Sequence, residues 1–286
     1  MDRITNSDSR KHRREGNQYL ITEKEIKQYH ELGYIVLNDV LTDEEMKTID
    51  PWFDHFVNGN EKDKMGRDFC DMSQPYGTPV EDFQLVNAML PSKYCSELVD
   101  NIYYKIAQNI VDQLYINGKA AIDYEQFLAK KPTKAGAEFA MHQDLGYWPK
   151  TKKTWTATFS LALSDSDLIN GCLQVIPGTN NEPELRKHMP KPFNGDNESE
   201  NVNRDETHTL VIDEKKSDKI SYLPVKRGSI TIHDERIIHG SGGNKSKDWR
   251  KTYVMAFRDV DTIAEERAIG FTHSHNDKVN WDEIIK

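Results

Sequence analysis

The chain has 286 residues, in which 47 acidic side chains outnumber 38 Lys and Arg for a net charge of −9. This length can bury a sizeable core, and the acidic balance argues against nucleic acid as a partner. The three cysteines are widely spaced, so neither a disulfide framework nor a thiolate zinc site is indicated. No apolar run reaches the roughly 18 residues of a membrane helix, and the polar start lacks a signal peptide's apolar stretch. We therefore expect a cytoplasmic protein without membrane association.

The first 120 residues favour helices. Residues 1–18 are charged and almost free of apolar side chains, which predicts a flexible arm. Two Thr-x-x-Glu pairs, beginning at Thr22 and Thr42, have the spacing of a capping box, so we expect a short helix after each, with the buried strand YIVL between them. An apolar residue at every fourth position across residues 92–116 predicts one long helix packed on a sheet.

From about residue 120 the pattern changes to short runs of β-branched and aromatic residues separated by Gly, Asn and Pro. This pattern is typical of a β-sandwich or barrel. Residues 180–220 are strongly polar and too numerous for a hairpin connection, which predicts a lid or insertion. Because no internal repeat is visible, we expect residues 19–286 to form a single domain.

A His-x-Asp pattern suggests a metal site. His142 and Asp144 are two positions apart, so on a strand both side chains point to the same face. A histidine from a distant strand would complete a set of two histidines and one carboxylate, which suits Fe(II) and leaves coordination positions open. His239 is the best candidate; we refer to His142, Asp144 and His239 as the candidate triad. By itself the pattern is short, and a hydrogen-bonded structural histidine is the commoner interpretation.

A second segment strengthens the metal interpretation. Arg250 follows His239 by eleven residues, across a Gly-rich turn, so that the two side chains can point into one barrel mouth from neighbouring strands. The rigid fork of Arg binds a carboxylate through two hydrogen bonds and keeps its charge. The sequence therefore predicts a carboxylate ligand beside the metal.

Four stretches make the chain resemble the phytanoyl-CoA dioxygenase family of Fe(II)- and 2-oxoglutarate-dependent oxygenases. They are HQDLGYW (142–148), NGCLQVIPGT (170–179), RGSITIHDERIIHGSGGN (227–244) and the Arg250-centred WRKTYVMAF. With the opening HELGYIVLNDVLTDEE, the resemblance extends over roughly residues 20–260. It implies a mainly β protein with flanking helices around a double-stranded β-helix, the cupin-like jelly-roll.

The resemblance also implies roles for individual residues. The candidate triad would bind Fe(II), with 2-oxoglutarate and O₂ as co-substrates, and Arg250 would bind the far carboxylate of 2-oxoglutarate. Ser241 would donate a hydroxyl to the same pocket, and Tyr124 would line it. The carboxylate of Asp144 disfavours halogenation, because related halogenases keep a small residue there to admit chloride.

Two departures from the family pattern concern the substrate. Asn180 stands where family members often have His, and some members carry an aromatic residue near the position of Ser160. Neither position belongs to the candidate triad, so the departures bear on substrate identity alone.

Several other side chains are further candidates for the site or for the surface. His233 lies six residues before His239, and we expect a strand residue beside the metal, not a ligand. Trp148 is the aromatic residue most expected to line a substrate pocket. Four histidines sit among polar residues and are expected at the surface: His188, His208, His273 and His275.

The expected activity is oxygenation of an unactivated C–H bond in a small-molecule metabolite, with release of succinate and CO₂. Hydroxylation is the default outcome, and oxidative cyclisation or desaturation stays open, as in the algal kainoid synthases of the wider family, whose substrates are amino-acid-derived. An acyl-CoA 2-hydroxylase is less favoured, because the acidic chain offers no evident basic cleft and its end shows no peroxisomal signal. A non-catalytic metal-binding jelly-roll sensor is the alternative from another class, and the intact triad and Arg250 disfavour it.

Overall fold

Two antiparallel sheets form the centre of the computed structural model, which describes residues 13–133, 137–190, 209–212 and 215–279. The large sheet has the strand order β3 (Tyr34–Leu37), β13 (Ile230–Asp234), β8 (Thr156–Ala162), β15 (Arg250–Asp259), β6 (Ala120–Lys130), β5 (Leu85–Met89) and β4 (Phe69–Asp71). The small sheet has the order β12 (Ser221–Leu223), β9 (Leu173–Ile176), β14 (Ile238–Ser241) and β7 (Phe139–His142). Together they form the mainly β, cupin-like jelly-roll that the sequence predicted.

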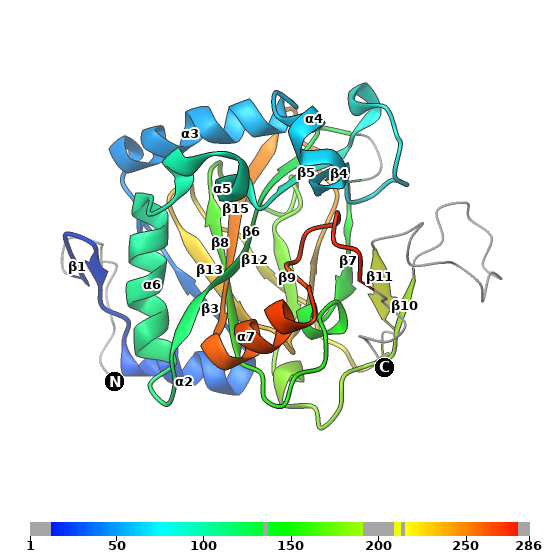
Figure 1. The fold of residues 1–286 in the computed structure, drawn as a ribbon. Coiled ribbons are helices and arrows are strands. Elements are labelled where there is room, and N and C mark those ends of the chain that lie inside the picture. Colours follow the sequence, from blue (N-terminus) through cyan, green and yellow to red (C-terminus); the bar gives the residue numbers. More distant parts are fainter. Residues whose placement is uncertain (1–12, 134–136, 191–208, 213–214, 280–286) are drawn as a thin grey trace.

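The helices pack on the outer face of the large sheet or beside the ends of its strands. They are α2 (Glu23–Leu32), α3 (Asp43–Val57), α4 (Lys62–Met65), α5 (Pro91–Tyr94), α6 (Ile102–Leu114) and α7 (Val260–Ala268). In Figure 1, α2 and α6 lie on the side of the molecule opposite β7. Apolar side chains of α2, α3 and α6 share one buried core with the outward residues of the large sheet.

Alternation along β15 divides the core from the cavity. Tyr253, Met255 and Phe257 belong to the apolar core beneath the helices. Arg250 and Thr252, at alternate positions, line a cavity on the inner face. The helices and the outward strand residues thus share one apolar core, which leaves the inner face available for polar chemistry.

The helix starts follow the sequence signals, with one exception. Thr22 and Thr42 both form the predicted capping boxes. The single helix expected over residues 92–116 is wrong, because Asp100 adopts a left-handed φ of 56° and Asn101 starts α6 afresh by accepting a hydrogen bond from the Tyr104 amide. The apolar stripe is real, but this turn breaks the helix that carries it.

The predicted arm over residues 1–18 is wrong from residue 13 onward. Strands β1 (Arg14–Glu15) and β2 (Gln18–Tyr19) form a small hairpin. Salt bridges from Arg13 to Glu25 and from Arg14 to Glu45 hold it against the starts of α2 and α3, at 2.5 and 2.6 Å. Residues 1–12 lie outside the described part of the chain.

The polar segment over residues 180–220 is described only at its two ends. β10 (His188–Pro190) pairs with β11 (Leu210–Ile212), and β11 packs beside β7 of the small sheet. Residues 191–208, where most of the predicted lid or insertion falls, lie outside the described residues. Across the described ranges, no helix combines the length and apolar character that crossing a bilayer requires.

Glu235, just after β13, makes the stability of this fold depend on pH. Its side chain is buried and accepts hydrogen bonds from the hydroxyls of Thr154 and Thr156 at 2.8 and 2.6 Å. Burial raises the pKa of Glu235 from 4.5 to about 7. Since the pKa is higher in the folded state, the stabilisation present at low pH is lost as the pH rises through that interval.

The wild type should therefore lose about 3 kcal/mol of unfolding free energy as the pH rises from about 4.5 to 7. Glu235→Gln, which cannot ionise, should not show this loss. Chemical denaturation of the wild type and the variant at a series of pH values measures this as a difference curve. Parallel curves across the interval would show that ionised Glu235 carries no penalty in the fold.

Candidate functional site

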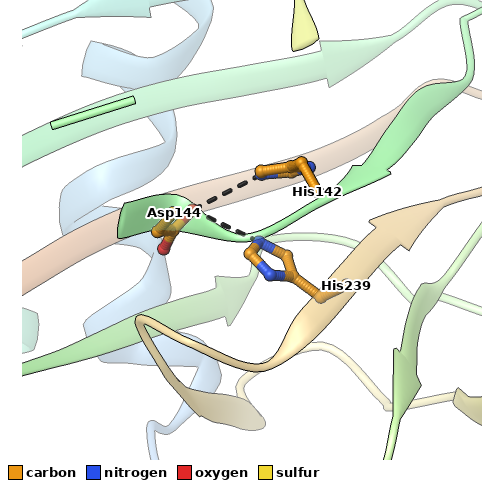
Figure 2. Close-up of side chains that lie close together, drawn as sticks. All are labelled: His142, Asp144 and His239. Atoms are coloured by element: carbon orange, nitrogen blue, oxygen red, sulfur yellow. Dashed lines mark ion pairs between the residues drawn. The ribbon is translucent and has the colours of Figure 1, made fainter. Parts of the chain in front are cut away.

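Three potential ligand atoms converge between β7 and β14. His142 ends β7 and pairs in register with His239 on the neighbouring strand β14, while Asp144 opens the turn that follows β7. The Nε2 atoms of both histidines lie 3.4 Å from Asp144 Oδ1, as the dashed lines in Figure 2 mark. The ligand atoms of the three residues all lie within 4.8 Å of one another. The structure thus brings the candidate triad together at a spacing that one metal ion can bridge.

Backbone carbonyls orient both imidazoles. His142 Nδ1 donates to the carbonyl of Ala140 at 2.8 Å, and His239 Nδ1 donates to that of Ile237 at 3.1 Å. These bonds leave the Nε2 lone pairs facing Asp144, the arrangement that metal-binding histidines use. The hydroxyl of Thr158 donates to Asp144 Oδ2 at 2.9 Å and fixes the carboxylate.

The protonation states also suit a metal ion. Burial opposes ionisation of Asp144, yet His239, His142 and His233 together hold its pKa well below the ordinary value. Burial, helped by the charge of His239, lowers the pKa of His142. An ionised carboxylate beside a neutral imidazole is the form in which these groups bind metals.

His233 is a third imidazole at the same carboxylate. It reaches across from β13 of the large sheet and places Nε2 3.3 Å from Asp144 Oδ2, with its ring centroid 4.0 Å from that of His239. Burial and the neighbouring His239 lower its pKa to about 4. His233 thus contacts the oxygen of Asp144 that faces away from the candidate triad, in the place expected for a neighbouring strand residue.

Arg250 is a buried cation without an acidic partner in the described part of the chain. It opens β15, and its guanidinium donates to the carbonyl of Gly171 and to the Thr252 hydroxyl, the latter at 3.1 Å. Its Nε is buried and makes no hydrogen bond to the residues that the structure describes. Burial lowers the pKa of Arg250 to about 10. A buried charge of this kind is costly until an anion binds it, and a carboxylate matches its fork.

Lys130 is a second buried cation beside Arg250 that the sequence analysis missed. It pairs with Arg250 across β6 and β15, and its ammonium donates to the carbonyls of Ser241 and Gly242. Burial, together with the charge of Arg250, lowers its pKa well below the ordinary value. No sequence signal separates Lys130 from the adjacent Lys131, because the distinction comes from strand pairing.

One cavity of about 170 Å³ contains the candidate triad and Arg250. Tyr124, Trp148 and Ser241 all line it, as the sequence predicted. Trp148 lies under the guanidinium of Arg258, 4.3 Å from the ring centroid, and this contact fixes its position in the wall. The candidate triad, the buried arginine and the aromatic wall therefore belong to a single pocket.

The expectation that His273 and His275 are exposed is wrong. The chain after α7, red in Figure 1, runs back across the front of the strands, and both rings line the cavity. His273 lies 2.7 Å from the buried carboxylate of Asp123, and His275 Nδ1 lies at hydrogen-bond distance, 2.7 Å, from the Tyr76 hydroxyl. Their polar surroundings in sequence concealed these long-range partners.

The two other histidines expected at the surface have different outcomes. His188 is half-buried and accepts a hydrogen bond from the Gln143 amide at 3.1 Å. His208 lies outside the described residues.

The comparisons with known proteins agree with this geometry. The sequence profile of the phytanoyl-CoA dioxygenase (PhyH) family matches residues 29–252. The chain is 24% identical over 257 residues to the human peroxisomal phytanoyl-CoA dioxygenase, covering 85% of this chain and 70% of that protein. The rat protein of the same name is 22% identical over 245 residues, 82% of this chain and 67% of the relative.

Solved structures share the fold at lower sequence identity. EvdO2 from Micromonospora carbonacea var. aurantiaca, complexed with 2-oxoglutarate, has a TM-score of 0.65 at 20% identity, covering 84% of this chain and 91% of that chain. EctD from S. alaskensis with bound Fe has a TM-score of 0.63 at 16% identity, covering 90% and 79% of the two chains.

A jelly-roll with two histidines and a carboxylate meeting between its sheets defines the class of mononuclear non-haem iron oxygenases. The chain belongs to the phytanoyl-CoA dioxygenase family. It is accordingly an Fe(II)- and 2-oxoglutarate-dependent dioxygenase, with O₂ as the oxidant.

Removal of one triad side chain should abolish tight metal binding. We expect His239→Ala to weaken Fe(II) binding by more than about 100-fold, since even a residue that merely supports a ligand contributes roughly 10- to 100-fold. Anaerobic isothermal titration with Fe(II) measures the affinity. His233→Ala is the matched comparison, because it removes an imidazole that supports Asp144 and should cost no more than about 10- to 100-fold; equal losses in both variants would contradict the assignment of His239.

Arg250 should control affinity for 2-oxoglutarate. Replacing a charged, two-pronged hydrogen bond removes about 1.5–3 kcal/mol, so Arg250→Ala should weaken 2-oxoglutarate binding by about 10- to 100-fold at unchanged Fe(II) affinity. Titration of the Fe(II)-loaded protein without O₂ measures this, with exposed Lys152→Ala as the control. Arg250→Lys, which keeps the charge, should lie between, and an unaltered affinity in Arg250→Ala would show that the carboxylate binds elsewhere.

Proposed function

We propose that residues 19–286 act as one dioxygenase domain that oxygenates an unactivated C–H bond of a small-molecule substrate, with release of succinate and CO₂. The single observation that carries this proposal is the shared cavity, which is lined both by the candidate triad and by Arg250, a buried cation without an acidic partner among the described residues. A metal site alone would also suit a sensor. The buried cation adds a reason for a dicarboxylate co-substrate to bind there.

In this proposal the chain's own residues position the reactants. His142, His239 and Asp144 hold Fe(II), which when bound couples O₂ reduction to the oxidative decarboxylation of 2-oxoglutarate. The carbonyls of Ala140 and Ile237 keep the two imidazoles in the ligating orientation. Three protein ligands on one side leave the remaining positions open toward the cavity.

Arg250 would orient the co-substrate by binding its far carboxylate. The guanidinium is buried, and a buried ion pair is stronger than one in water, because the local dielectric is low. Lys130 adds positive charge next to Arg250, and its ammonium donates hydrogen bonds to the carbonyls of Ser241 and Gly242. Ser241 and Tyr124 line the same cavity and would complete the co-substrate pocket.

The rest of the cavity would hold the substrate in a fixed pose. Phe139, Trp148 and Phe271 give it apolar wall residues. Hydroxylation is the default result, while oxidative cyclisation or desaturation, as on amino-acid-derived substrates, would need the same triad and a different substrate pose. The substrate therefore decides the outcome through its position relative to the metal.

An acyl-CoA 2-hydroxylase remains the second candidate because of the names of the family relatives. Among the described residues that line the cavity, Arg250 is the sole Lys or Arg. A second cationic side chain for the phosphates of coenzyme A is thus missing from this lining. This observation favours an uncharged small molecule over an acyl-CoA.

The direct test is substrate-dependent succinate formation. The purified protein, with Fe(II), 2-oxoglutarate and O₂, is offered a panel of small amides, amino-acid derivatives and acyl-CoAs, and products are identified by mass spectrometry. We expect at least one panel member to raise succinate formation while gaining one oxygen atom or losing two hydrogens, and Asp144→Ala to abolish both. Absence of succinate formation across the whole panel would favour a metal-binding sensor.

A further inference from the structure

Asn87 places an unsatisfied amide oxygen at the wall of the cavity. It lies on β5, is completely buried and lines the pocket. Its Oδ1 has no hydrogen-bond partner among the residues that the structure describes. Its Nδ2 finds only the sulfur of Cys70, at 3.9 Å. Burial of an unpaired amide oxygen costs about 1–3 kcal/mol, so a hydrogen-bond donor from a ligand would relieve a real penalty.

Gln126 presents a second amide on the neighbouring strand. Asn87 pairs with Leu128, and Met89 pairs with Gln126, so Asn87 and Gln126 lie diagonally on the same face of the large sheet. The Oε1 of Gln126 accepts a hydrogen bond from the Tyr124 hydroxyl. The Nε2 of Gln126 is therefore the end of this amide left for a ligand. One acceptor and one donor thus lie on the same face of the large sheet, at diagonal positions of two neighbouring strands.

Asn87 lies apart from the proposed co-substrate pocket, while Gln126 borders that pocket through its hydrogen bond with Tyr124. Arg250 and Thr252 are on β15, whereas β5 is separated from β15 by β6. Because neighbouring strands are about 4.8 Å apart, Asn87 lies on a strand roughly 10 Å from that of Arg250. A molecule bound between Arg250 and the candidate triad would leave the β5 side of the cavity for the substrate.

The surroundings of the two amides favour an uncharged ligand. Met72, Met89, Leu128 and Phe271 give this side of the cavity an apolar surface. The nearest imidazoles are already engaged, since His273 pairs with Asp123 and His275 with Tyr76. An anion here would lose its hydration without gaining a cation, which is strongly unfavourable.

We propose that Asn87 Oδ1 and Gln126 Nε2 form a substrate subsite that recognises a carboxamide or lactam on an otherwise apolar molecule. The N–H of the ligand donates to Asn87, and its carbonyl accepts from Gln126. This inference rests on the proposed function, because it names the substrate class of the same cavity. It makes Asn87 a specificity-determining residue that discriminates an amide from the matching carboxylate.

The test measures binding, so that it does not depend on turnover. The Fe(II)- and 2-oxoglutarate-loaded protein is titrated without O₂ with matched pairs of probes, such as cyclohexanecarboxamide with cyclohexanecarboxylate, and δ-valerolactam with 5-hydroxypentanoate. We expect the amides to bind at least about 10-fold more tightly than the acids, as one hydrogen bond of about 1.4 kcal/mol would give. Asn87→Leu should remove this preference and leave the affinity for 2-oxoglutarate unchanged.

Two variants guard against a folding defect. Asn87→Asp keeps an acceptor oxygen and should retain amide binding better than Asn87→Leu, while Gln126→Leu should weaken amide binding by removal of the donor. Equal binding of amides and acids, no binding of any amide probe, or weaker 2-oxoglutarate binding in Asn87→Leu would overturn the subsite. Absence of 2-oxoglutarate binding by the wild type would instead refute the proposed function, so the two failures are distinguishable.

Discussion

The buried carboxylate of Asp144 is the constraint on which the site depends. One of its oxygens faces the Nε2 atoms of His142 and His239 from the small sheet, and the other faces Thr158 and His233 from the large sheet. An anion at this position would be costly without these neighbours, since they hold its pKa low. The pairing of β7 with β14 and the packing of the two sheets therefore surround the Asp144 carboxylate with these partners.

Two buried cations form a second electrostatic feature of the site, with Arg250 in the cavity lining and Lys130 beside it. Arg250 and Lys130 are both buried, and burial lowers the pKa of each. In the described chain their hydrogen bonds go to carbonyls and a hydroxyl, which satisfy donors without neutralising charge. An acidic co-substrate would supply the missing charge. Such a site trades stability of the free protein for affinity toward its ligand.

The sequence predicted the triad because strand periodicity puts positions 142 and 144 on one face, and because His239 and Arg250 flank a single Gly-rich turn. It also located the helix starts, since a capping box is a local signal. It could not find Lys130, Asn87, His273 or His275, whose roles arise from strand register or from contacts between segments far apart in the chain. The prediction of one helix over residues 92–116 failed for a related reason, because the left-handed backbone of Asp100 interrupts a regular apolar pattern.

The most direct test of the central claim is a crystal structure of the protein grown without O₂ in the presence of Fe(II) and 2-oxoglutarate, with anomalous diffraction recorded at the iron edge. We expect one iron peak bonded to His142 Nε2, His239 Nε2 and the Asp144 carboxylate, with the far carboxylate of 2-oxoglutarate paired to Arg250. An iron peak away from these three residues, or a guanidinium of Arg250 that makes no contact with 2-oxoglutarate, would contradict the account.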